Sequence, residues 1–195
     1  MHRAHGLPSA PRDGELPTLR GSKVLLRWLT AEDVDALHEI FSDPEVARYL
    51  AIPRQRSREE SERFLAEIHE GFRTRSLYQW GIEHAGRLIG TCTLGGIDWE
   101  NRRAEIGFVL GRSSWGQGLM PGALALLIDH SFGELGLHRI EADVDPRNGA
   151  SLRLLDKLGF RREGHLRERY FKDGEIQDSI MLGLLRPEYL EATTG

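Results

Sequence analysis

The stretch Trp115-Gly116-Gln117-Gly118-Leu119-Met120-Pro121-Gly122 joins a strand pattern at residues 104–110 to an apolar helix pattern at about residues 123–135. Glycines let backbone amides crowd together without Cβ atoms in the way. A proline fits the first helical turn, where a missing N–H costs nothing. A glycine loop that leads into a helix N-terminus binds anions, and phosphate is the usual one. The stretch therefore predicts a phosphorylated ligand.

Three kinds of phosphate loop compete for this stretch. Gly116, Gly118 and Gly122 read G-x-G-x-x-x-G, which is one residue too long for the dinucleotide fingerprint. The Walker loop needs Gly-Lys-Ser/Thr, which is missing here. The third candidate is the pyrophosphate loop of acyl-CoA-dependent N-acetyltransferases, commonly Arg/Gln-x-x-Gly-x-Gly/Ala. Trp115 then stands where Arg or Gln is commonest, and Met120 where Gly or Ala is. A glycine-rich turn without a ligand is the alternative.

A second motif follows at residues 148–164, after a strand pattern at 138–144 that Pro146 ends. It reads Asn-x-x-Ser-x-x-Leu-Leu-x-Lys-Leu-Gly-Phe-x-x-Glu-Gly, with Gly159 ending a short helix. This pattern resembles the hallmark of the Gcn5-related N-acetyltransferases (GNAT superfamily). In particular, it resembles the RimJ/RimL type, which acetylates the N-termini of ribosomal proteins. The resemblance covers roughly residues 18–190, and it is supported by the stretches at residues 41–49, 104–108 and 171–175.

The expected fold class is α/β. Hydrophobic alternation predicts strands at residues 24–29, 77–83, 88–97, 104–110, 138–144, 160–167 and 175–184. Capping patterns and apolar faces predict helices at residues 30–42, 57–73 and 123–135, and a short helix after Pro146 that ends at about residue 158. The resemblance implies the GNAT fold. That fold has a mixed, mostly antiparallel central sheet of six to seven strands, helices on both faces, and strands splayed at the acyl-CoA site. We expect residues 1–16 to be a flexible leader and residues 17–195 to form a single acyl-CoA N-acyltransferase domain.

Bulk composition narrows the function class. The formal net charge is −4 and the isoelectric point is about 6.1, which argues against a general nucleic-acid binder. No apolar run approaches 18 residues, so we expect no membrane span or membrane partner. One cysteine cannot form an internal disulfide, and no secretory signal pattern is visible, which together favour the cytoplasm. The resemblance allows a homodimer, since the family often forms dimers.

The resemblance implies acetyl-CoA as the acyl donor, and no metal. The amides of residues 116–120 would hold the pyrophosphate, beside the partial positive charge of the helix N-terminus. Backbone groups at the end of the preceding strand would pair with the pantetheine arm, and Asn148 would hold it further along. The predicted cofactor-binding residues are Phe108, Val109, Leu110, Trp115, Gly116, Gln117, Gly118, Leu119, Met120, Asn148 and Ser151. Plain core packing is the alternative for Phe108 and Leu110.

Two residues are predicted to be catalytic. The family usually protonates the leaving thiolate with a tyrosine seven residues after the motif asparagine, but Leu155 stands there. The RimJ/RimL branch often places a serine near the sulfur instead, and Ser151 matches it; a helix-cap serine is the alternative. Glu105 is the predicted base, acting through water, with a surface carboxylate as the alternative. Tyr170 and Asp178 are secondary candidates.

The acceptor is predicted from pKa values and from the resemblance. An α-amine has a pKa near 7.8 and a lysine near 10.4, so a weak, water-relayed base suits an α-amine. We therefore expect transfer to a protein N-terminal α-amine, as in ribosomal proteins. A small amine such as a polyamine, an aminoglycoside or an amino acid is the nearer alternative, and a non-catalytic acyl-CoA-binding module is the other. Tyr49, Trp99 and Tyr170 are predicted to line the acceptor pocket. Gly122 replaces the glutamate usual in the branch, which weakens any transfer of exact substrate identity.

Overall fold

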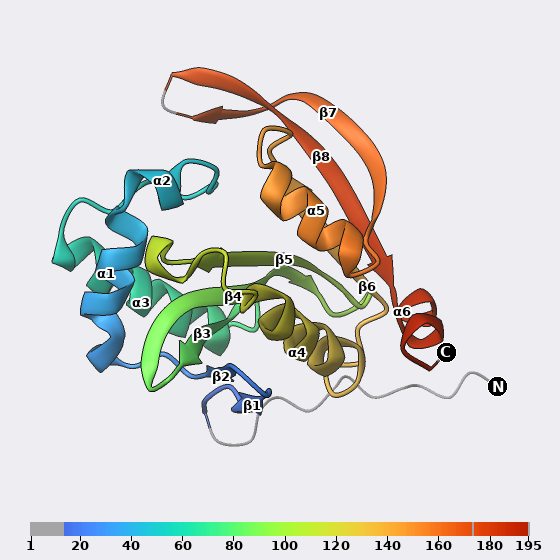
Figure 1. Cartoon of the computed structure of the whole chain (residues 1–195), viewed down its shortest axis with the longest axis horizontal. Coiled ribbons are helices and arrows are strands. Elements are labelled where there is room, and N and C mark those ends of the chain that lie inside the picture. The colour runs from blue at the N-terminus through green and yellow to red at the C-terminus, as the bar shows by residue number, and fades with distance from the viewer. Residues whose placement is uncertain (1–13, 173, 195) are drawn as a thin grey trace.

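The structure is a computed structural model that describes residues 14–172 and 174–194, and it is built on one eight-stranded sheet (Figure 1). The strand order is β1-β2-β3-β4-β5-β6-β8-β7. Neighbours run antiparallel except for β5 and β6, which are parallel. The strands are β1 Leu19–Arg20, β2 Leu25–Arg27, β3 Tyr78–His84, β4 Arg87–Asp98, β5 Arg103–Leu110, β6 Arg139–Val144, β7 Arg161–Lys172 and β8 Glu175–Leu185. The α/β class and the mostly antiparallel sheet are confirmed. The sheet has one strand more than the upper expected number, because β1 has only two residues and so shows no alternation to detect.

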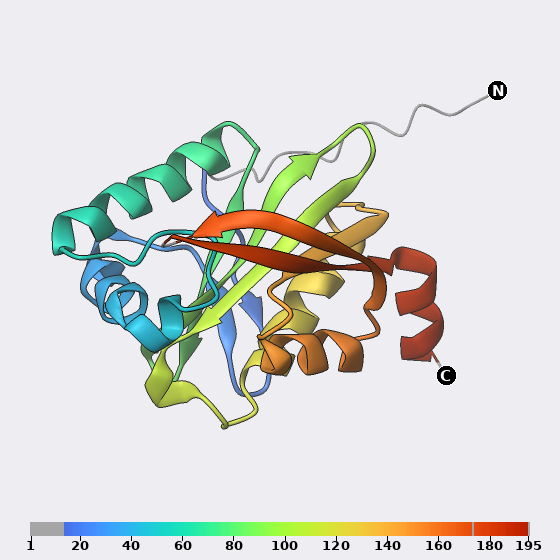
Figure 2. The ribbon, with the colours of Figure 1, turned by 90° about the horizontal axis from the view of Figure 1, so that it is seen from above.

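Helices cover both faces of the sheet (Figure 2). The 3-10 turns and helices are η1 Ala31–Asp33, α1 Val34–Ser42, α2 Pro44–Ala47, α3 Arg58–Arg73, η2 Arg112–Ser114, α4 Met120–Phe132, α5 Gly149–Lys157 and α6 Arg186–Thr194. The helices α1 and α3 pack on one face, whereas α4 and α5 pack on the other. The sequence analysis missed α2 and α6. α2 is a single turn capped by the Asp43 side chain, which is too short to show helical periodicity. In the described residues, no helix is long and apolar enough to cross a membrane.

The main core lies between the sheet and α4. Trp80 is fully buried there, and its Nε1 donates a hydrogen bond to the Pro17 carbonyl oxygen at 2.9 Å. Leu16, the last residue of the predicted leader, is buried in the same cluster. Its burial places Leu16 with the folded domain, while residues 1–13 of the predicted leader lie outside the described residues.

The sheet opens between β5 and β6. Their parallel pairing covers three positions only, and it ends at Glu105 opposite Glu141. Beyond that point β5 continues to Leu110 paired with β4 alone, and β6 continues to Val144 paired with β8 alone. The predicted splay of the strands is therefore present, and it leaves one backbone edge of the C-terminal half of β5 without a neighbouring strand.

Candidate active site

The glycine loop between η2 and α4 carries a row of backbone donors. Gly116 and Gly118 have φ of +73° and +67°, which is the left-handed region that favours glycine. In the part of the chain that the structure describes, the amides of residues 116–120 have no hydrogen-bond partner. These five amides precede or begin α4, where the helix dipole adds positive potential. The loop therefore has the donors and the polarity to hold a pyrophosphate.

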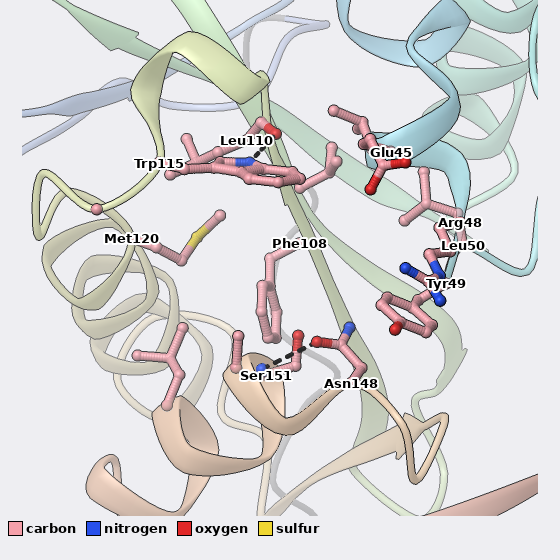
Figure 3. Close-up of a pocket in the computed structure, with 15 residues that line it drawn as sticks. Glu45, Arg48, Tyr49, Leu50, Phe108, Leu110, Trp115, Met120, Asn148 and Ser151 are labelled. Carbon is pink, nitrogen blue, oxygen red and sulfur yellow. Dashed lines mark hydrogen bonds between the residues drawn. The ribbon is translucent and has the colours of Figure 1, made fainter.

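Trp115 fixes this loop to the end of β5. Its Nε1 donates to the Leu110 carbonyl oxygen at 2.8 Å, and its ring lies near Met120 in the wall of a cleft (Figure 3). The Gln117 side chain donates from Nε2 to the Ser113 carbonyl oxygen at 2.9 Å. Trp115 stands where the family usually has Arg or Gln. Its hydrogen bond occupies one lone pair of the Leu110 carbonyl oxygen, at the open edge of β5.

The cleft beside the loop has a volume of about 400 Å³ and mainly apolar walls. Its lining comes from the α2 region, β5, the glycine loop and the start of α5: Glu45, Val46, Arg48, Tyr49, Leu50, Phe108, Val109, Leu110, Trp115, Gly116, Met120, Asn148, Ala150, Ser151 and Leu154 (Figure 3). The structure brings together most of the predicted cofactor-binding residues in this lining. The exceptions are Gln117, Gly118 and Leu119, which belong to the loop but do not line the cleft. Leu119 is buried against the core.

Asn148 and Ser151 stand at the start of α5. Asn148 is the N-cap residue, and its side-chain oxygen accepts from the Ser151 backbone N–H at 3.2 Å. Ser151 is therefore in the first helical turn, as the alternative had it, and it also lines the cleft; its role at the thiolate stays a prediction. Leu155, in the position where the family usually has a tyrosine, is fully buried in the core and has no group that could protonate a thiolate.

An acidic recess adjoins the cleft, since Tyr49 and Leu50 line both. The recess has a volume of about 260 Å³. It contains four carboxylates and one lysine among its lining residues, which are Tyr49, Leu50, Ala51, Pro53, Glu105, Asp143, Asp145, Tyr170, Phe171, Lys172, Gln177 and Asp178. Because its carboxylates outnumber its cation, the recess favours a positively charged ligand.

Glu105, the predicted base, lies in this recess. The partial burial of Glu105 raises its pKa, and the neighbouring charges of Asp143 and Glu141 raise it further, while Arg169 acts in the opposite direction. The side chain reaches solvent, but the concave surroundings displace part of its water, so desolvation is the leading cause. A carboxylate with a raised pKa accepts a proton more readily near neutral pH.

The two secondary base candidates, Tyr170 and Asp178, are less suited to accept a proton. The hydroxyl of Tyr170 donates to Asp143 Oδ2 at 2.7 Å, and burial together with that bond raises the pKa of Tyr170 to about 12. The pKa of Asp178 is lowered by the backbone N–H of Glu168 at 2.9 Å and by His165 at 2.7 Å. Tyr170 is therefore protonated at neutral pH and Asp178 binds a proton weakly, so Glu105 stays the predicted base.

Trp99 is not brought to the recess, which corrects its predicted role in the acceptor pocket. Its Nε1 donates to the Arg75 carbonyl oxygen at 2.9 Å, and its ring centroid lies 5.8 Å from that of Tyr78. It lines neither the cleft nor the recess, so its place is in the packing beside α3. The single cysteine, Cys92, is fully buried, and burial raises the pKa of its thiol, so it is a poor nucleophile for an acyl-cysteine route.

Asp143 and Lys172 are among the recess residues that were not predicted to belong to the site. The alternation of β6 placed Asp143 on the polar face of that strand. It could not indicate that the partner of Asp143 is Tyr170, which lies on β7. Lys172, at the end of β7, donates from Nζ to the carbonyl oxygens of Ala47 at 2.7 Å, Arg48 at 3.2 Å and Leu50 at 2.5 Å. Those partners are more than 120 positions away in the sequence, so no local pattern could indicate them.

Comparisons with known proteins agree with this geometry. A family model described as an acetyltransferase (GNAT) domain matches residues 23–161. An uncharacterized N-acetyltransferase, p20 of Bacillus licheniformis, is 38% identical over 178 residues, which cover 89% of this chain and 99% of the relative. The crystal structure of a spermidine N-acetyltransferase from Vibrio cholerae in complex with CoA and spermine has a TM-score of 0.79 and 27% identity, and covers 87% of this chain and 99% of its own. Mycobacterium smegmatis RimJ in complex with CoA-disulfide has a TM-score of 0.79 and 26% identity, with 91% and 93% covered.

Proposed function

Because this chain belongs to the GNAT superfamily and is an acetyl-CoA-dependent N-acetyltransferase, we propose that its acceptor is the N-terminal α-amine of a protein or peptide, held in the acidic recess. The resemblance to the RimJ/RimL branch supports this acceptor, as does the structural likeness to a RimJ. The acetyl donor would lie in the cleft, with its pyrophosphate on the amides of residues 116–120.

One observation carries the choice of an α-amine. In the recess, burial raises the pKa of the Glu105 carboxyl, while burial and the bond to Asp143 keep Tyr170 in its protonated form. About a third of α-amines are neutral at pH 7.5, against about 0.1% of lysine side chains. A weak base therefore suffices for an α-amine, of which a large fraction is already neutral, whereas a lysine side chain must first be deprotonated.

The acetyl group passes directly from the thioester to the amine in one displacement. The neutral amine attacks the thioester carbonyl carbon, so that a C–N bond forms and the C–S bond breaks. The amine proton passes through water to Glu105, and the leaving thiolate accepts a hydrogen bond from the Ser151 hydroxyl. Ordinary thiols ionise near pH 8.5, so the thiolate is a tolerable leaving group without full protonation.

A polyamine is the second candidate, and a specific observation favours it. Four carboxylates, those of Glu105, Asp143, Asp145 and Asp178, line a recess of about 260 Å³. One of the similar solved structures is named as a spermidine N-acetyltransferase with bound spermine. However, three of these carboxylates already accept hydrogen bonds from neighbours, which reduces what they offer to a polycation.

Release of CoA thiol, measured from acetyl-CoA at fixed pH, separates these acceptors. We expect a higher kcat/KM with a peptide that has a free N-terminus than with spermidine, and none with the same peptide when its N-terminus is blocked. A higher kcat/KM with spermidine would replace the peptide by a polyamine. No turnover with any amine would overturn catalysis altogether.

A further inference from the structure

A third hollow lies on the other side of α2 from the cleft. Its volume is about 800 Å³. It is formed by α2, the following segment and α3, and its lining residues are Pro44, Ala47, Arg48, Ile52, Pro53, Arg54, Gln55, Arg56, Glu60, Arg63, Phe64, Glu67 and Lys172. We call it the basic hollow, because four arginines and a lysine outnumber its two glutamates.

Much of this positive charge is available to a ligand. In residues 14–172 and 174–194, the guanidinium groups of Arg48, Arg54 and Arg56 have no carboxylate partner. Arg48 instead lies over the Tyr49 ring, with 5.2 Å from its Cζ to the ring centroid. The Lys172 ammonium is occupied by the three carbonyl oxygens at the end of α2.

The carboxylates of the hollow do not neutralise these groups. Glu60 accepts from the Arg56 backbone N–H at 2.6 Å and lies 4.0 Å from Arg63. The whole chain has a net charge of −4, so this local excess has the opposite sign to the molecule. Because the walls are concave, they concentrate the field of the guanidinium groups on whatever enters. The chemistry of the hollow therefore suits carboxylates, which arginine binds with charge-assisted hydrogen bonds.

The basic hollow borders the acidic recess. Pro53 and Lys172 line both, and the hairpin of β7 and β8 lies beside the segment after α2 at this border (Figure 2). A peptide whose N-terminal amine sits near Glu105 can cross this border within a few residues, since each extended residue spans about 3.3–3.6 Å. A polyamine would meet repulsion there instead.

We propose that the basic hollow binds the carboxylate side chains of the acceptor, so that the preferred acceptor is a peptide with acidic residues shortly after its N-terminus. This inference rests on the proposed N-terminal acceptor and adds the sequence preference of that acceptor. The hollow thereby acts as a specificity site beyond the reacting amine.

Three heptapeptides test the preference. They share their first two residues and carry three glutamates, three glutamines or three lysines at positions three to five. We expect the glutamate peptide to have a KM about tenfold below that of the glutamine peptide, equivalent to about 1.4 kcal/mol. We expect the lysine peptide to have the highest KM, and the differences to shrink as salt is added, because exposed charges are screened.

A double variant, Arg54→Gln with Arg56→Gln, assigns the effect to the hollow. We expect it to bring the ratio of the glutamate and glutamine KM values close to one. The double variant Arg20→Gln with Arg87→Gln removes the same charge from exposed positions on β1 and at the start of β4, and we expect it to retain the ratio.

The outcomes separate this inference from the proposed function. If both peptides have the same KM in the unmodified protein, or if both double variants change the ratio equally, the basic hollow is not a specificity site although the peptide acceptor stands. If spermidine is acetylated and no peptide is, both proposals fail. The N-acetylated glutamate peptide should also inhibit competitively against the peptide acceptor; no inhibition, or equal inhibition by its lysine counterpart, would contradict the site.

Discussion

The substitution Glu105→Gln tests the central chemical assignment. It removes the carboxylate from the recess while keeping a side chain of nearly the same size at the end of the β5–β6 pairing. Asp143 and Glu141 remain as neighbouring carboxylates, but Asp143 already accepts from Tyr170 and Ser179, and Glu141 accepts from Arg139 and Arg103. Neither is therefore a ready replacement.

The expected loss follows from the chemistry of the acceptor. A positioned general base typically contributes about 10²- to 10⁴-fold. About a third of an α-amine is already neutral at pH 7.5, and Glu105 reaches solvent and is proposed to act through water, so the lower end applies. We expect kcat/KM for a peptide to fall about 100-fold, or about 2.7 kcal/mol, at the usual 1.36 kcal/mol per tenfold.

The pH dependence gives a sharper assay. If Glu105 takes the proton from an arriving ammonium group, the ratio of unmodified to variant kcat/KM should fall as pH rises through the amine pKa of about 7.8, because less protonated amine remains. CoA thiol release at a series of pH values from 6.5 to 9 measures this ratio, with Glu100→Gln as the exposed control remote from the recess. A full rate for Glu105→Gln at pH 7 would refute the assignment of Glu105 as the base. A ratio that does not change with pH would show that Glu105 takes its proton only after the neutral amine has attacked.

The same substitution, Glu105→Gln, should raise the thermal stability of the protein although it lowers the rate. The pKa of Glu105 is raised in the folded protein, mainly by burial and then by its acidic neighbours. A raised folded pKa gives a contribution to stability that is full below the unfolded pKa and is lost as pH rises through the folded pKa. At pH 7 the unmodified protein has lost this contribution, so the neutral glutamine should raise Tm. A fall in Tm together with the loss of rate would mean that the substitution damaged the fold.

Three further substitutions test separate parts of the site. Ser151→Ala should lower kcat about fivefold through the loss of about 1 kcal/mol of hydrogen bonding, while Tm stays unchanged because Asn148 caps α5 through the backbone N–H of residue 151; an unchanged kcat would assign thiolate release to solvent. Gly118→Ala puts a side chain at φ +67°, at a cost of about 1–2 kcal/mol, and should raise the KM for acetyl-CoA at least fivefold. Gly86→Ala, at φ +76° and with equally open space, should lower Tm but leave that KM unchanged, and equal KM changes in both would remove the loop from cofactor binding. Lys172→Met removes the donor that holds the end of α2, so it should raise the KM for the acceptor more than the KM for acetyl-CoA; equal effects on both would show that the contact is only structural.

Much of the fold and of the cleft could be predicted from local patterns. The loop was recognisable because two left-handed positions require glycine, and these are Gly116 and Gly118. The Asn148 motif was recognisable because an N-cap and a helix-ending Gly159 have strong local preferences. The position of Trp99 could not be predicted in this way, because the sequence pattern of an aromatic residue between two strands is the same whether the side chain lines a pocket or packs in the core.

The acceptor side depended on contacts that no local pattern encodes. Asp143 and Tyr170 are 27 positions apart, and Lys172 meets Leu50 across 122 positions. Sequence patterns register only preferences within a turn or a strand, whereas the recess is formed where β5 and β6 separate and the β7–β8 hairpin folds back onto the end of α2.

The sequence by itself determined the family, the GNAT fold and the loop for the donor, because backbone conformation and capping are decided by neighbouring residues. Only the tertiary structure decided that the pKa of Glu105, the predicted base, is raised and which carboxylates share its recess. Those properties arise from desolvation and from charges brought together by distant segments, as at Glu105, and their strength depends on distance through space rather than along the chain.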